Sequence, residues 1–175
     1  YLLNFINKNE FDTTYHEHLS YFLVKPLIQV FAKNGFEIFD IYKSTIHGGS
    51  IRVFVKKKRN SFIKVDFDAI HWLLELENDL GLYDIETYLR FSEDVIKIKS
   101  DLIKLLKQLN KKNKNVAAYG ASAKGTVLSN YCGVEKNLVQ YVVDDTPEKQ
   151  GCLTPGSRIP IVDFSLTRTI AFDFT

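Results

Sequence analysis

Apolar residues recur at a spacing of three or four in several long stretches of the chain. This spacing places the apolar side chains on one face of a helix. Ser20 can cap the first of these stretches and Gly35 can stop it. Pro26 falls inside this stretch, so a later start near Lys25 is the alternative. The pattern predicts four helices, over residues 20–34, 62–80, 84–112 and 123–131.

Shorter apolar runs, some of them alternating with polar residues, predict strands over residues 36–42, 51–55, 116–119, 138–143 and 158–162. Gly48 and Gly49 separate the first two, as in an antiparallel hairpin. The later order of strand, glycine loop, helix and strand is a βαβ unit, which forms a parallel sheet. Tyr1-Leu2-Leu3 reads as the end of another buried strand. The fold class is therefore α/β.

The 175 residues suffice for one domain or slightly more, and 45% of them are hydrophobic. A formal net charge of +2 is too small to indicate a nucleic-acid partner. The lysine clusters at 56–59 and 111–114 fall at predicted element ends, where solvated loops are expected. The chain begins at Tyr1 and contains no methionine, so we expect it to be the C-terminal part of a larger protein.

Two cysteines, Cys132 and Cys152, show neither metal-ligand spacing nor a disulfide pattern. We expect no metal site in this chain and a reduced, cytoplasmic protein. No signal peptide and no apolar run long enough for a bilayer are visible, which indicates no membrane partner.

The segment Tyr15-His16-Glu17-His18 places three proton-handling residue types in four consecutive positions. A histidine titrates near pH 6.5 and serves as a base close to neutrality. A neighbouring carboxylate can orient it, and a phenol can donate to a developing oxyanion. The segment alone is equally compatible with a polar surface turn.

A second candidate site lies in the loop Gly120-Ala121-Ser122-Ala123-Lys124-Gly125, which follows a predicted strand and opens a helix. Backbone N–H groups there form an anion site, and Asp144 ends the next strand at the usual place of a ribose-binding acid. The loop has neither the dinucleotide fingerprint nor a Walker A sequence. A plain tight turn with a solvated Lys124 remains the alternative.

The glycines beside His47 allow a close approach to a ligand, although an ordinary hairpin histidine fits equally well. His71, inside an apolar helix beside Trp72, is interpreted as a packed core or boundary residue rather than a ligand.

Several ordered motifs together carry a family resemblance. They cover residues 11–21, 46–53, 119–125, 130–133, 141–144, 149–151, 155–156 and 159–160. In this order and spacing the chain resembles the S-adenosylmethionine-dependent C-methyltransferases of nucleotide-linked keto-deoxysugars. The resemblance extends to about Val162, whereas residues 165–175 depart from the pattern that it implies.

The resemblance implies three parts: an N-terminal zinc module, a central methyl-donor domain and a Rossmann-like C-terminal domain that binds the nucleotide sugar. Residues 1–60 then correspond to the end of a class I methyltransferase domain, with its helices and hairpin. Residues 61–112 form a helical connector, and residues 113–175 form the Rossmann-like parallel-sheet domain. The zinc cysteines and the main S-adenosylmethionine pocket are expected upstream of this chain.

The implied reaction removes the C3 proton of a 4-keto sugar, and the enolate attacks the sulfonium methyl group. By resemblance His18 is the base, while Tyr15 and Glu17 are its neighbours at the same site. By the same resemblance His47 matches a histidine beside the sugar. The resemblance implies an active-site cleft, one half of which binds the nucleotide sugar, and a thymidine-type diphosphate sugar is expected there. The residues that match this half are Gly120, Ser122, Lys124, Gly125, Asn130 and Asp144.

Two other functions stay open on the sequence. The chain could be a non-catalytic module that binds a nucleotide sugar, because the acidic-glycine motif for the methyl donor is missing from it. It could also be a gene remnant without a ligand.

Overall fold

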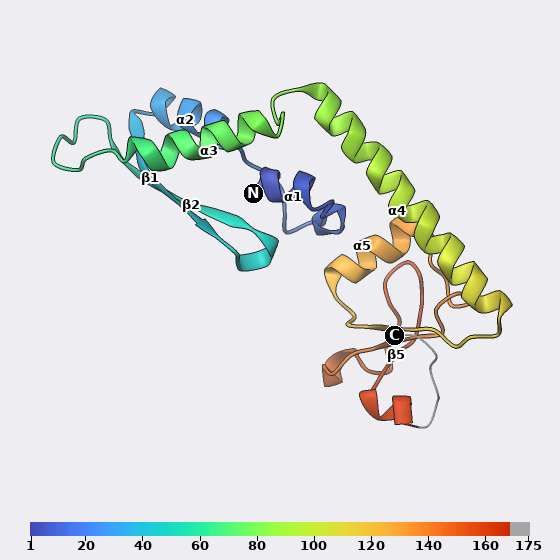
Figure 1. The fold of residues 1–175 in the computed structure, drawn as a ribbon. Coiled ribbons are helices and arrows are strands. Elements are labelled where there is room, and N and C mark those ends of the chain that lie inside the picture. Colours follow the sequence, from blue (N-terminus) through green and yellow to red (C-terminus); the bar gives the residue numbers. More distant parts are fainter. Residues whose placement is uncertain (169–175) are drawn as a thin grey trace. The chain divides into compact units, whose positions relative to one another are not determined.

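The computed structural model describes residues 1–168, apart from the side chains of His47, Thr167 and Arg168. The chain divides into two compact units (Figure 1). The N-terminal unit comprises Tyr1–Phe11 and His18–Glu93, and the C-terminal unit comprises Asp12–Glu17 and the chain from Asp94 onward. Of the divergent segment 165–175, residues 169–175 lie outside the described part.

A β-hairpin is the centre of the N-terminal unit. Strands β1 (Phe36–Ser44) and β2 (Ser50–Lys57) pair antiparallel, with Ile41 opposite Val53 and a bulge between Ile38 and Asp40. The short 3₁₀ helix η2 (Ile46–Gly48) connects them. The hairpin predicted from the Gly-Gly connection is confirmed.

Helices α2 (Val24–Lys33) and α3 (Phe67–Asp79) cover one side of this hairpin (Figure 1). Buried Val24, Ile38, Ile41 and Leu73 form the core between them. Asp66 caps α3 by accepting a hydrogen bond from the Ala69 N–H at 3.0 Å. The helix therefore begins five residues later than the apolar pattern predicts.

Two predictions near the start of the chain are wrong. Residues Leu2–Asn7 form a helix, α1, rather than a strand end, and Leu3 is buried against Leu23 and Leu82. Helix α2 is not capped by Ser20. Its N-cap residue is Leu23, whose apolar side chain cannot form a hydrogen bond with the end of the helix. The backbone N–H of Val24 instead donates to the Glu77 carboxylate at 2.6 Å.

Glu77, on α3, is completely buried and collects three donors. Besides Val24, the Tyr1 hydroxyl donates to Oε1 at 2.8 Å, and the Tyr83 hydroxyl donates to Oε2. Burial and the hydrogen bond to Glu77 raise the pKa of the Tyr1 and Tyr83 phenols well above their usual value. One carboxylate therefore joins the N-terminal segment, α2 and the chain after α3.

Two side chains lie where the sequence does not place them. Lys56 is buried at the end of β2, where its ammonium donates to the carbonyls of Asn60 and Ile63 and pairs with Glu37 at 3.2 Å. It anchors the following loop instead of being solvated. His71 is exposed, not packed, and pairs with Glu75 one helical turn away at 3.0 Å.

Helix α4 (Ile85–Lys111) confirms the predicted long helix closely. Its later apolar residues, Leu102, Ile103, Leu106 and Leu109, pack on the core of the C-terminal unit. Glu86 lies in its first turn and Lys111 in its last, which suits the helix dipole.

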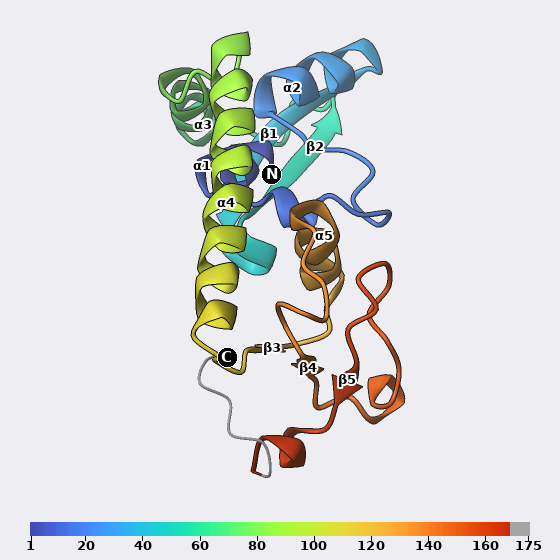
Figure 2. The same cartoon turned by 90° about the vertical axis from the view of Figure 1, so that its right-hand side faces the viewer.

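The C-terminal unit contains a three-stranded parallel sheet in the order β3-β4-β5 (Figure 2). These strands are short, at Ala117–Tyr119, Tyr141–Val143 and Ile161–Val162, and α5 (Ala123–Cys132) connects the first two. The βαβ unit is therefore confirmed, with strands shorter than predicted. The fold is mixed α/β, with one antiparallel hairpin and one parallel sheet among the described residues.

Candidate functional site

The carboxyl ends of β3, β4 and β5 lie along one edge of the parallel sheet, where ligands bind in open α/β sheets. The residues that follow these ends are Gly120, Asp144-Asp145 and Asp163. The N–H of Gly120 donates to the carbonyl of Val143 at 2.7 Å, so the glycine loop starts directly beside the end of β4.

The loop from Gly120 to Gly125 leads into the N-terminus of α5. Gly120 has φ +91°, a conformation that favours glycine. Ser122 is the N-cap of α5, and its hydroxyl accepts a hydrogen bond from the Gly125 N–H at 3.1 Å. Lys124, in the first turn, is partly buried. The position at a helix N-terminus suits the predicted anion site, although the N–H groups of Gly120, Ala121 and Gly125 already form hydrogen bonds within the chain.

Asp144 holds the loops of this edge together. It is 7% exposed, and its carboxylate accepts hydrogen bonds from the N–H groups of Thr146 at 2.9 Å and Ala121 at 2.6 Å. The Lys149 ammonium lies 3.2 Å from Oδ2 and also donates to the Ala121 carbonyl at 3.0 Å. The hydrogen bonds from Thr146, with those from Ala121 and Lys149, keep the Asp144 pKa well below its usual range.

These contacts change the expected role of Asp144. Its two oxygens already serve the chain's own backbone, whereas a ribose-binding acid presents an oxygen to the ligand. Asp144 acts first as a tether between the Gly120 loop and the loop after β4.

Replacing Asp144 by asparagine is expected to lower the melting temperature at pH 7 and to flatten the acid side of the stability profile. The folded-state pKa is depressed, so the carboxylate stabilises the fold above its unfolded pKa of about 3.9 and loses that contribution as the pH falls below it. Thermal unfolding from pH 7 to pH 3 measures both effects. Glu148→Gln, an exposed change in the same loop, is the control; equal curves for the two variants would refute the tether.

Asn130, another predicted substrate-binding residue, also forms hydrogen bonds within the chain. Its amide donates to the carbonyls of Thr126 at 2.8 Å and Pro155 at 3.0 Å. Gly156 has φ +76°, and a Cβ there would overlap the Asn130 side chain. Asn130 and Gly156 therefore lock the 155–156 turn onto α5.

The segment Tyr15-His16-Glu17-His18, referred to as the tetrad, is divided between the two units. Tyr15 and Glu17 belong to the C-terminal unit and His18 to the N-terminal unit. Tyr15 and His18 are half-buried, whereas His16 and Glu17 are exposed. The Tyr15 N–H closes a turn onto the Thr13 carbonyl at 3.0 Å, directly after the 3₁₀ helix η1 (Phe11–Thr13).

Aromatic rings position His18. Its imidazole stands edge-on to Tyr21, with ring centroids 6.5 Å apart. Tyr21 in turn packs on Phe5 at 4.5 Å, and Phe5 on Phe91 at 5.0 Å. The imidazole thus has an aromatic neighbour that is itself packed against other rings.

The loop that carries His47 is held from α1. Gly48 and Gly49 have φ of +86° and +143°, and Cβ atoms there would overlap the side chains of Glu10 and Asn4. The amide of Asn4 and the ammonium of Lys8 donate to the Gly48 carbonyl. The glycines therefore serve close packing against the N-terminal segment, and the His47 side chain lies outside the described residues.

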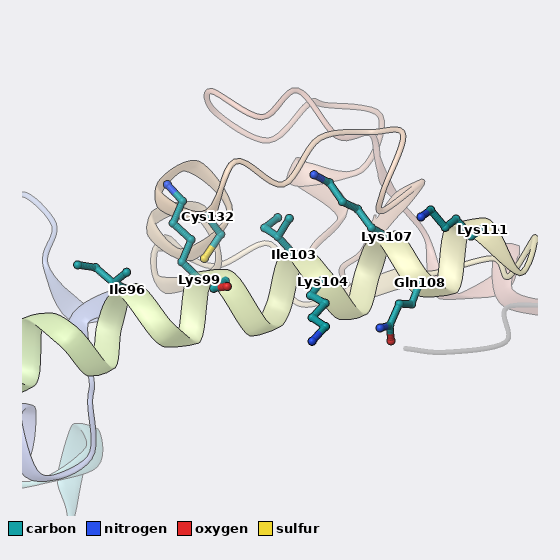
Figure 3. A pocket seen from close by; sticks show the side chains of 9 residues that line it. Ile96, Lys99, Ile103, Lys104, Lys107, Gln108, Lys111 and Cys132 are labelled. Carbon is teal, nitrogen blue, oxygen red and sulfur yellow. The ribbon is translucent and has the colours of Figure 1, made fainter.

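A groove of about 640 Å³ along α4 escaped the sequence analysis (Figure 3). Lys99 and Lys107 point to the same side of the helix as Ile103 and the thiol of Cys132, whereas Lys104 points away (Figure 3). Lys111 completes the set of four lining lysines. The spacing of these lysines, three to five residues apart, could have predicted a basic face on α4. The apolar stripe of the same helix obscured this pattern.

The described residues contain neither a metal-binding cluster nor a membrane-spanning helix. No group of three or more histidine, cysteine or acidic side chains there could hold a metal ion. No helix within the described part combines the length and apolar character needed to cross a membrane.

Two comparisons identify relatives of this chain. Residues 45–173 match the family model described as the C-methyltransferase C-terminal domain. The C-methyltransferase NovU of Streptomyces niveus is 34% identical over 164 residues, which cover 92% of this chain and 38% of NovU. The chain thus spans well under half of that relative's length. Because the family model covers most of the chain, the protein belongs to the family of the C-methyltransferase C-terminal domain.

Proposed function

We propose that this chain is the C-terminal part of an S-adenosylmethionine-dependent enzyme that methylates a carbon of a nucleotide-linked 4-keto-deoxysugar. The observation that carries the proposal is the tetrad Tyr15-His16-Glu17-His18 in a chain of a C-methyltransferase family. Enolate formation needs a base, and it is helped by a donor to the developing oxyanion, such as a phenol, and by a carboxylate that orients the base.

In this mechanism His18 removes the proton at C3, which the neighbouring C4 ketone acidifies. Tyr15 donates a hydrogen bond to the oxygen as negative charge develops on it. Glu17 orients the base or the sugar, and His47 contacts the sugar. Each role concerns moving a proton or holding the substrate, and these are the steps assigned to this chain.

The groove along α4 does not fit the methyl donor itself. S-adenosylmethionine supplies an electrophilic methyl group on a positively charged sulfur. The α4 groove is lined by Lys99, Lys104, Lys107 and Lys111, whose charge repels such a cation. We propose that the donor pocket lies in a part of the enzyme outside this chain, which covers 38% of NovU, with residues 1–60 as the end of the donor domain and residues 61–112 as its connector.

Residues 113–175 are proposed to be a Rossmann-like domain that binds the nucleoside diphosphate of the sugar. The Gly120–Gly125 loop at the N-terminus of α5 would contact the diphosphate through backbone N–H groups and Lys124. The parallel sheet and the loop after β3 support this assignment.

Calorimetric titration with a thymidine-diphosphate 4-keto-6-deoxysugar tests the proposal. We expect the chain to bind this sugar nucleotide and not S-adenosylmethionine, and Lys124→Ala to weaken binding about 10-fold, since a charge-assisted hydrogen bond is lost. Lys136→Ala, which removes an exposed lysine of the same unit, is the matched control. A chain that binds neither compound, or only S-adenosylmethionine, would contradict the proposal.

A second candidate function is a nucleotide-sugar-binding module without catalysis. The four lysines that line the α4 groove, whose charge opposes a cationic methyl donor there, favour it for this chain alone. Turnover by the full-length protein separates the two, because only the enzyme methylates the sugar.

A further inference from the structure

Three side chains that do not belong to the Gly120 loop lie together at the carboxyl edge of the parallel sheet. Tyr119 is the last residue of β3, Asp145 comes two residues after β4, and Phe164 comes two residues after β5. The rings of Tyr119 and Phe164 meet edge to face, with centroids 6.5 Å apart and an interplanar angle of 85°. Residues from all three strand ends therefore form one surface.

This aromatic pair is open to solvent. Tyr119 is 62% exposed and Phe164 48% exposed, whereas the valines of β4 beside them are buried. A ring pair contributes most to stability when it is buried, and these two residues stay exposed. Exposed aromatic faces at the ligand-binding edge of a sheet are suited to stacking on a flat ring of a ligand.

A hydrogen bond fixes the orientation of the pair. The Tyr119 hydroxyl donates to Oδ2 of Asp145 at 2.5 Å, and this bond raises the pKa of the Tyr119 phenol. The phenol therefore stays a donor at neutral pH, and its ring is held beside Phe164. Holding the ring in place before binding reduces the entropy lost when a ligand stacks on it.

The two acids at the end of β4 have different surroundings. Asp144 is buried, and both of its carboxylate oxygens accept hydrogen bonds from the loops, whereas Asp145 is exposed. Tyr119 occupies only Oδ2 of Asp145, and Oδ1 has no donor among the described residues. The acid able to accept a hydroxyl from a ligand at this edge is therefore Asp145.

We propose that Tyr119, Phe164 and Asp145 bind the nucleoside of the nucleoside diphosphate, with the base stacked on the two rings and a sugar hydroxyl donating to Asp145. This inference rests on the proposed function, in which the adjacent Gly120 loop binds the diphosphate. Tyr119 precedes Gly120 directly, so base and phosphate sites are continuous along one strand end. The nucleoside-binding acid is thereby Asp145 rather than Asp144.

Binding of thymidine diphosphate and of inorganic diphosphate to the full-length protein separates the two halves of the site. Phe164→Ala and Tyr119→Ala are expected to weaken thymidine diphosphate binding about 5- to 100-fold, which is the usual effect of removing a stacking ring. Binding of inorganic diphosphate stays unchanged. Tyr119→Phe keeps the ring and loses only the bond to Asp145, so its effect is smaller. Asp145→Asn is expected to weaken the binding of thymidine diphosphate relative to that of inorganic diphosphate.

Phe62→Ala is the control, because Phe62 is 95% exposed and lies in the other unit. Circular dichroism verifies that each variant is folded. If the wild type binds thymidine diphosphate and both alanine variants keep the same affinity ratio, the nucleoside assignment is overturned while the proposed function stands. If the wild type binds neither ligand, the proposed function fails and this assignment fails with it.

Discussion

Replacing His18 by asparagine in the full-length protein is expected to lower methyl transfer by about 10²- to 10⁴-fold, the usual contribution of a general base. Asparagine retains the size and polarity of the side chain but cannot accept the C3 proton. Affinity for the sugar nucleotide should change little, because the proposed nucleotide contacts lie in the other unit. Turnover and calorimetry measure the two effects.

Solvent deuterium exchange at C3 of the substrate isolates the proton step. The wild type should exchange this proton in the absence of a methyl donor, and the His18→Asn variant should not. His16→Asn is the matched control, since it makes the same substitution two residues away on an exposed side chain. Full turnover in His18→Asn would remove His18 as the base, and loss of nucleotide binding would indicate a structural role instead.

Local patterns predicted the elements of this fold where the local signal is strong. The 27-residue helix α4 agrees with its apolar stripe to within a residue at each end. Gly48 and Gly49 correctly marked the hairpin, although their packing against Glu10 and Asn4 depends on a segment more than 35 residues away. A sequence pattern contains no information about such distant partners.

The failures have the same origin. Ser20 has the right chemistry for a cap, yet the first N–H of α2 is satisfied by Glu77, 53 residues further along. Lys56 belongs to a run of basic residues that looks solvated, and only the folded loop supplies the carbonyls that hold it. Long-range acceptors thus override local preference in both cases.

The candidate site shows how far motif reasoning extends. The βα loop and the acids after β4 were correctly placed at one sheet edge, because parallel strands align their carboxyl ends. The division of labour between Asp144 and Asp145 was not visible, since adjacent acids look alike in sequence. Which of them is buried depends on Ala121, Thr146 and Lys149. The catalytic roles of Tyr15, Glu17, His18 and His47 stay predictions.

The second large effect is expected at Glu77, where Glu77→Leu should destabilise the N-terminal unit by about 3–5 kcal/mol. Leucine fills a similar volume but accepts no hydrogen bond. The buried Val24 N–H loses its acceptor, which costs about 1–3 kcal/mol. The Tyr1 and Tyr83 hydroxyls lose theirs as well, at a lower cost because both are only partly buried. Thermal unfolding and amide exchange of Val24 measure the loss.

Glu75→Leu provides the control, because Glu75 lies two residues away on α3 and makes only an exposed pair with His71. Such pairs contribute about 0–1 kcal/mol, so this variant should unfold close to the wild type. Glu77→Gln keeps one acceptor oxygen and should fall between the two. Equal stability of Glu77→Leu and Glu75→Leu would show that the buried carboxylate does not hold the unit together.

The same network predicts a dependence on alkaline pH. Burial and then the bond to Glu77 raise the folded-state pKa of Tyr1 and Tyr83, so the neutral phenols stabilise the fold below their unfolded pKa of about 10. That contribution is lost as the pH rises beyond this value. Glu77→Leu removes the hydrogen bonds, and its stability should therefore fall less steeply above pH 10 than that of the wild type. Parallel slopes for the two proteins would mean that burial alone, without the Glu77 bonds, raises the pKa of both phenols.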